Sequence, residues 1–126
     1  MAPGWAAFVL AAVVVFWPAT VVAAVVVCDL LDFRDDLKSF SDTAALVSQL
    51  DLVISVDTSV AHLAGALAKP VWVLVPFVPD WRWQLDRDDS PWYPTARVFR
   101  QDDARNWAHV IARVHAALSE FVQSRL

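Results

Sequence analysis

The segment over residues 51–76, DLVISVDTSVAHLAGALAKPVWVLVP, constrains the fold more than any other part of the chain. Its two apolar, β-branched runs, Leu52–Val56 and Val71–Val75, are typical of strands buried on both faces of a parallel sheet. Between them, the cap-type residues 57–59 open a small, alanine-rich helix over Val60–Ala68. Two buried strands joined by a helix predict parallel neighbours with a right-handed crossover.

The rest of the chain continues this alternation of strands and helices, which predicts an α/β fold with a parallel sheet. The last helix has the clearest pattern, because its apolar residues recur at the i, i+3, i+4, i+7 spacing of one face. The further elements that we expect are a strand over Val25–Leu31, a helix over Thr43–Leu50 capped by Ser41 and Asp42, a short strand over Arg97–Arg100, and the last helix from Ala104 to Val122, with Asp102 and Asp103 at its positive end.

The helix over Val60–Ala68 begins at the carboxyl end of the preceding strand, where α/β proteins hold phosphates against free amides and the positive end of the helix dipole. His62 lies one turn into this helix, within reach of an anion at its N-terminus. We expect Gly65 to let the helix lie close to the sheet. The plainer interpretation is that residues 57–59 are only a helix cap and that His62 only packs.

A family resemblance rests on the same residues. The run DTSVAHLAGA at 57–66 resembles the D-T-x-x-x-H segment of heptosyltransferase-like glycosyltransferases, and is most similar to bacterial members that carry tetratricopeptide repeats. The runs PDWRW at 79–83 and DDSPWYP at 88–94 are similar to the same subgroup. The resemblance covers residues 29–122. It implies a Rossmann-like C-terminal half of a GT-B glycosyltransferase, over residues 28–126, and a missing N-terminal domain as its partner.

The resemblance also implies site residues. Asp57, Thr58, Ser59 and Val60 correspond to the residues that hold the diphosphate and donor sugar of a nucleotide-diphosphate-sugar, and we place His62 beside them. Many heptosyltransferases have glycine where this chain has Ser59, which leaves the closeness of approach open.

Two residues of the loop after the second apolar strand complete the candidate site. Trp81 and Arg82 follow the carboxyl end of that strand, where binding loops occur. Arg82 bridges phosphates or contacts the facing domain in this interpretation. Trp83 either joins the site or anchors the loop over residues 76–95.

Other polar and aromatic residues near the candidate site have simpler explanations. The family needs no metal, so we expect neither a metal nor another cofactor, and we interpret Asp86, Asp88 and Asp89 as a solvated acidic loop. Trp92 and Tyr93 are expected to pack. Phe40 either packs back on its helix as a hydrophobic staple or borders the nucleotide base.

The resemblance therefore implies the donor-binding part of a metal-independent inverting glycosyltransferase that is inactive by itself. The general base comes from the first domain in this family, and no catalytic residue is expected here. Two alternatives stay open: a non-catalytic nucleotide-binding or interaction module, and a small membrane-anchored protein.

The first 27 residues differ from the remainder. The run Trp5–Val27 has no charged residue and is long enough, at about 1.5 Å per residue, to span a bilayer. No lysine or arginine precedes it and Pro18 interrupts it, so a membrane helix, a signal peptide and a start foreign to the domain all remain open. The net charge of −4, without basic clusters, argues against nucleic acid as a partner. We expect a cytoplasmic protein, with membrane association through residues 5–27 as the alternative.

Overall fold

The computed structural model describes residue 33 and residues 35–125 of the chain. The apolar leader and the predicted strand Val25–Leu31 lie outside these residues. Among the described helices, none has the length and apolar character needed to cross a bilayer.

Three parallel strands form the centre of the fold, in the order β1-β2-β3. The elements follow one another as α1 (Phe40–Gln49), β1 (Val53–Val56), α2 (Ser59–Ala66), β2 (Val71–Val75), the 3-10 turn η2 (Trp81–Trp83), β3 (Ala96–Arg100) and α3 (Trp107–Gln123). The predicted parallel pairing of the first two strands through α2 is confirmed: Val53 lies opposite Val71 and Val56 opposite Leu74. The α/β fold with a parallel sheet and flanking helices is confirmed with it.

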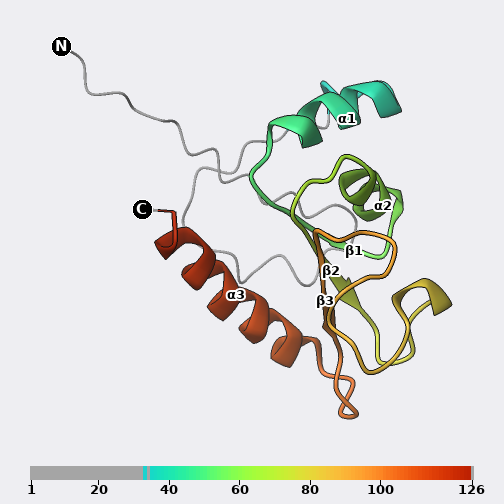
Figure 1. Cartoon of the computed structure of the whole chain (residues 1–126), viewed down its shortest axis with the longest axis vertical. Coiled ribbons are helices and arrows are strands. Elements are labelled where there is room, and N and C mark those ends of the chain that lie inside the picture. The colour runs from blue at the N-terminus through green and yellow to red at the C-terminus, as the bar shows by residue number, and fades with distance from the viewer. Residues whose placement is uncertain (1–32, 34, 126) are drawn as a thin grey trace.

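The helices cover both faces of the sheet (Figure 1). α1 and α2 lie on one side and α3 on the other. β2 is buried along its whole length, with alternate residues pointing into the two cores. Val71, Val73 and Val75 pack toward α2, whereas Trp72 and Leu74 pack toward α3. Burial on both faces explains why this strand reads as a continuous apolar run.

The two cores differ in composition. The α2 side is filled mainly by valine and alanine, with the fully buried Trp83 entering from η2. The α3 side has an aromatic centre, in which Trp72 contacts both Phe99 and Phe121. The buried residues that α3 contributes are Val110, Val114 and Ala117, which confirms its predicted apolar face.

The N-termini of α1 and α3 differ from their predicted positions. α1 is capped by Ser39, which forms a capping box with Asp42, so Ser41 and Asp42 lie inside the helix instead of at its N-cap. Phe40 is the first residue of the helix and 57% exposed, which makes the predicted staple role wrong.

α3 begins at Trp107, three residues later than expected, with Asn106 as its cap. Arg105 takes a φ of 52° just before this cap, and a left-handed residue cannot extend the helix backward. Asp102 and Asp103, which were expected at the positive end of the helix, therefore lie in the loop ahead of its cap. Asp102 is nevertheless tied to it, since its Oδ2 lies 2.6 Å from Nδ1 of His109.

α2 ends in a Schellman motif. The Ala68 amide donates to the Gly65 carbonyl and the Lys69 amide to the Ala64 carbonyl, each at 3.0 Å. Ala68 takes the left-handed conformation, with φ 54°, at the position where glycine is usual. The helix therefore ends before Lys69 and Pro70, two residues earlier than predicted.

Candidate functional site

The candidate site lies where β1 passes into α2. Thr58 is the N-cap of α2, but its side chain makes no capping hydrogen bond. Its Oγ1 lies 3.2 Å from Oγ of the buried Ser55 instead. The Ser59 and Val60 amides consequently have no acceptor within the described residues. By contrast, the first turns of α1 and α3 are capped by the side chains of Ser39 and Asn106.

His62 is held on both sides of its ring. Its Nε2 lies 3.5 Å from Oδ1 of Asp57, and its Nδ1 lies 3.0 Å from the hydroxyl oxygen of Tyr93. The ring also stacks on Trp83, with 5.4 Å between the ring centroids and an interplanar angle of 24°. One third of the His62 side chain remains exposed (33%), so a ligand has access to it. The structure thus brings together two predicted residues, Asp57 and His62.

Tyr93 and Trp83 are the residues of this cluster that sequence reasoning undervalued. Tyr93 was expected only to pack, yet its hydroxyl contacts His62. Trp83 is 0% exposed and packs into the α2-side core. Of its two interpretations, the one in which Trp83 anchors the loop is therefore confirmed. The signal for Tyr93 was present in the DDSPWYP run, but nothing local in the sequence indicates a contact across 31 positions.

Trp81 and Arg82 form a separate group on η2. Asp80 caps this turn, and its Oδ1 accepts hydrogen bonds from the Arg82 amide at 3.0 Å and from Nη1 of Arg82 at 2.8 Å. The guanidinium of Arg82 lies 4.7 Å from the centroid of the Trp81 ring, and the edge of that ring system meets Trp92. Trp81 is 67% exposed.

The charge of Arg82 is thus already paired in this structure. The pKa of the Asp80 carboxyl is lowered, chiefly by the hydrogen bond from the Arg82 amide and then by the Arg82 guanidinium, with a smaller contribution from the charge of His62. The link from η2 to the β1–α2 junction runs through Trp83, which stacks on His62, whereas no hydrogen bond, ion pair or ring contact joins Trp81 or Arg82 to residues 57–62 in the described part of the chain.

The acidic loop after η2 has its own partners. Arg87 donates two hydrogen bonds to the Asp89 carboxylate, at 2.6 and 2.8 Å. This pairing lowers the pKa of Asp89 and raises that of Arg87. Over residues 35–125, no group of three or more histidine, cysteine or acidic residues is placed to hold a metal ion.

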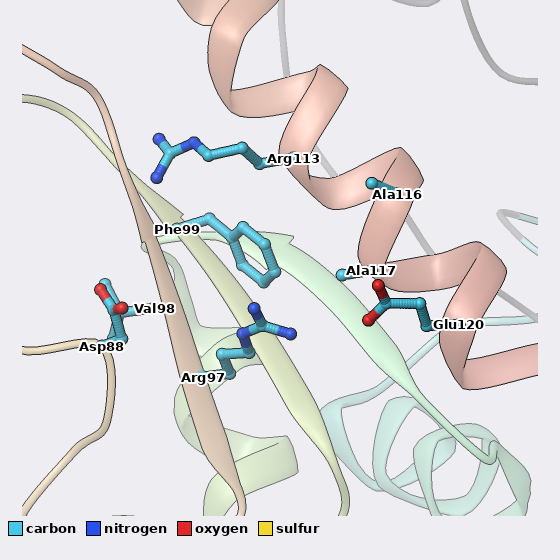
Figure 2. Close-up of a pocket in the computed structure, with 8 residues that line it drawn as sticks. All are labelled: Asp88, Arg97, Val98, Phe99, Arg113, Ala116, Ala117 and Glu120. Carbon is cyan, nitrogen blue, oxygen red and sulfur yellow. The ribbon is translucent and has the colours of Figure 1, made fainter. Parts of the chain in front are cut away.

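A pocket of about 270 Å³ lies on the opposite face of the sheet, between β3 and α3. Figure 2 shows the Arg97 and Glu120 side chains pointing toward the space beside the Phe99 ring. No residue of the predicted site lines this pocket. The pocket and the β1–α2 junction are therefore separate features of the domain.

The fold and the junction define a Rossmann-like α/β protein in which the first described strand leads into a helix whose first turn has no side-chain cap. Residues 38–79, from α1 through β2, match glycosyltransferase family 9 (heptosyltransferase). This match confirms, over residues 38–79, the family resemblance found in the sequence.

The chain is also similar to Protein FlbA of Caulobacter vibrioides (strain ATCC 19089 / CIP 103742 / CB 15), with 34% identity over 94 residues. The matched region is 75% of this chain and 15% of FlbA. A comparison with solved structures gave no significant match.

Proposed function

We propose that this chain supplies the donor-binding part of a metal-independent inverting glycosyltransferase, and that it holds the diphosphate of a nucleotide-diphosphate-sugar at the β1–α2 junction. The match of residues 38–79 to glycosyltransferase family 9 supports the class of reaction. The observation that carries the site is the uncapped first turn of α2. Because Thr58 directs its hydroxyl toward Ser55, the Ser59 and Val60 amides stay free for an anion.

His62 and Asp57 have different roles in this proposal. An imidazole N–H donates a charge-assisted hydrogen bond to a phosphate oxygen. A carboxylate accepts hydrogen bonds and repels phosphate, so Asp57 suits a hydroxyl of the donor sugar. Nε2 of His62 and Oδ1 of Asp57 lie only 3.5 Å apart. One nucleotide-diphosphate-sugar can therefore place a phosphate oxygen on His62 and a sugar hydroxyl on Asp57.

The chemistry of inverting transfer divides between two parts of such an enzyme. A general base must take the proton from the acceptor hydroxyl, and hydrogen-bond donors must stabilise the departing diphosphate. The free amides and His62 supply the donors. We assign the base to the facing N-terminal domain that the family resemblance implies.

Isothermal titration calorimetry with UDP and ADP, on the full chain in the presence of EDTA, tests the site. A charge-assisted hydrogen bond contributes roughly 1.5–3 kcal/mol, so His62→Ala should weaken diphosphate binding by about one to two orders of magnitude. Thr58→Pro should weaken it at least as much, because proline cannot adopt the φ of −142° that Thr58 has at the N-cap and therefore disturbs the start of the helix.

The matched control is Asp88→Ala. The Asp88 side chain lines the separate pocket between β3 and α3, and its carbonyl, which accepts from the Val98 amide at 2.7 Å, is retained in the variant. This change should leave the affinity unaltered. Equal affinities for the wild type and the His62 variant, or binding that needs added magnesium, would contradict the proposal.

A non-catalytic nucleotide-binding module is the second candidate, and the pairing of Arg82 favours it. Arg82 is bound to Asp80 at 2.8 Å and lies over Trp81, so it is not free to neutralise a departing diphosphate. Sugar transfer by this chain joined to a family N-terminal domain distinguishes the two. A catalytic part gives turnover with the donor, whereas a binding module only binds it.

A further inference from the structure

We propose that Tyr93 is a positioning residue for His62. Tyr93 holds the imidazole with its Nε2–H directed toward Asp57 and the start of α2. The use of that N–H by a diphosphate rests on the proposed function. The orientation and tautomer of the ring do not, and they are tested separately below. The inference starts from the two contacts of the ring, 3.0 Å from Nδ1 to the Tyr93 hydroxyl and 3.5 Å from Nε2 to Asp57.

The chemistry of the two neighbours assigns the protons. A neutral imidazole has one N–H donor and one acceptor nitrogen, and an ionised carboxylate only accepts. The nitrogen that faces Asp57 must therefore carry the hydrogen, which makes it Nε2–H. Nδ1 is then the acceptor, and the Tyr93 hydroxyl donates to it. A phenylalanine at position 93 would keep the ring contacts but leave Nδ1 without its donor.

Packing fixes the Tyr93 ring at this place. A Cβ atom added to Gly65 would lie 2.4 Å from Cγ and 2.6 Å from Cδ1 of Tyr93, so the ring occupies the space that only a glycine leaves. On its other side, Tyr93 lies 6.4 Å from Trp83 between ring centroids, and Trp83 in turn stacks on His62. The three rings form one cluster, which we call the His62 ring cluster (His62, Trp83 and Tyr93).

The backbone of Tyr93 is held as well. The hydroxyl of the buried Ser90 accepts from the amides of Trp92 and Tyr93, at 3.2 and 3.3 Å, and the Tyr93 carbonyl accepts from the Ala96 amide at 2.9 Å. These bonds tie Tyr93 to the start of β3. The phenol is thus fixed from the sheet, and it can fix the imidazole in turn.

The first test reads the ring nitrogens directly. Long-range ¹H–¹⁵N spectra of the full chain, at a pH where His62 is neutral and with His62→Gln to assign the signals, should show Nε2 as the protonated nitrogen. In Tyr93→Phe the Nδ1 resonance should move toward that of an imidazole nitrogen that accepts no hydrogen bond. Trp92→Phe, which changes a neighbouring ring that contacts Trp81, should leave it in place.

Protonation at Nδ1 in the wild type, or an Nδ1 resonance that Tyr93→Phe leaves unmoved, would overturn the inference. Because these spectra need no ligand, they remain decisive even if the chain fails to bind nucleotide diphosphates, which would count against the proposed function alone.

The second test is a double-mutant cycle on UDP or ADP binding by the full chain. Loss of one hydrogen bond should make Tyr93→Phe bind roughly two- to tenfold more weakly. If Tyr93 acts through His62, the same change should have no further effect in the His62→Ala background. An equal loss in both backgrounds would show that Tyr93 supports the fold or the ligand independently of His62, and would overturn its positioning role.

Discussion

The ring of Tyr93 lies directly against the backbone of Gly65, with Cγ only 2.4 Å from the position that a Cβ atom would occupy. Gly65 was expected to bring α2 close to the sheet, but what it admits is a side chain from the loop before β3. The phenol reaches Nδ1 of His62 from this place. A helix residue without a side chain thus determines whether a loop residue can contact the candidate site.

Gly65→Ala should therefore disturb the His62 ring cluster. The gain in helix propensity, about 1 kcal/mol, is opposed by an overpacking cost of about 1–3 kcal/mol, because the atoms in the way belong to the base of a ring and not to a flexible end. We expect a net loss of stability in urea unfolding, together with the loss of the Tyr93–His62 hydrogen bond in ¹⁵N spectra. A more stable variant that keeps this bond would contradict the contact.

The two tryptophans of η2 should respond in opposite ways. Trp83→Ala removes a side chain that is 0% exposed, and such changes cost about 3–5 kcal/mol. Trp81→Ala removes a ring that is 67% exposed and contacts the Arg82 guanidinium, so its cost should stay below about 1 kcal/mol. Urea unfolding followed by circular dichroism measures both. If Trp83→Ala does not fold, Trp83→Phe gives the comparison. Equal costs for the two positions would contradict the anchoring role of Trp83.

Ala68→Gly should stabilise the domain. A left-handed conformation costs a non-glycine residue roughly 1–2 kcal/mol, and Ala68 has a φ of 54°. Glycine relieves this cost but gives back about 0.4–1 kcal/mol through the greater entropy of the unfolded chain. The expected net gain is about 0.5–1 kcal/mol in the free energy of unfolding.

Ala66→Gly, in the last turn of α2, is the matched control and should lose about 1 kcal/mol in the free energy of unfolding. A loss at both positions would be inconsistent with the Schellman motif.

The β1–α2–β2 unit could be predicted from sequence because its signals are local. Val71–Val75 is apolar throughout, and the helix after Thr58 is rich in small residues between two such runs. The loop between β2 and β3 gave no comparable signal. Gln84 and Asp86 both take left-handed φ values, yet neither is a glycine, so the residue types do not mark these turns.

The candidate site, like the fold, could be predicted only where its signals are local. Asp57 directly precedes the N-cap of α2 and His62 lies one turn into that helix, so the local sequence is sufficient to bring them together. Tyr93 joins them only through the packing of its ring on Gly65, which depends on the tertiary position of a loop. The direction of the Thr58 hydroxyl, toward Ser55 instead of the α2 amides, likewise follows from the burial of Ser55 beneath α2.

Acid should weaken the capping box of α1. The pKa of Asp42 lies below its ordinary value, chiefly because the Ser39 hydroxyl and then the Ser39 amide donate to its carboxylate. A carboxyl with a lowered folded pKa contributes stability that is present above its unfolded pKa, near 3.9, and lost as the pH falls through the folded value. Asp42→Asn should therefore unfold at lower urea concentration than the wild type at pH 7, and the difference should shrink below about pH 4.

Asp103→Asn controls for the general loss of negative charge, because the Asp103 side chain makes no hydrogen bond within the described residues. A difference between Asp42→Asn and the wild type that stays constant from pH 7 to pH 3 would show that the carboxylate of Asp42 does not act through its charge.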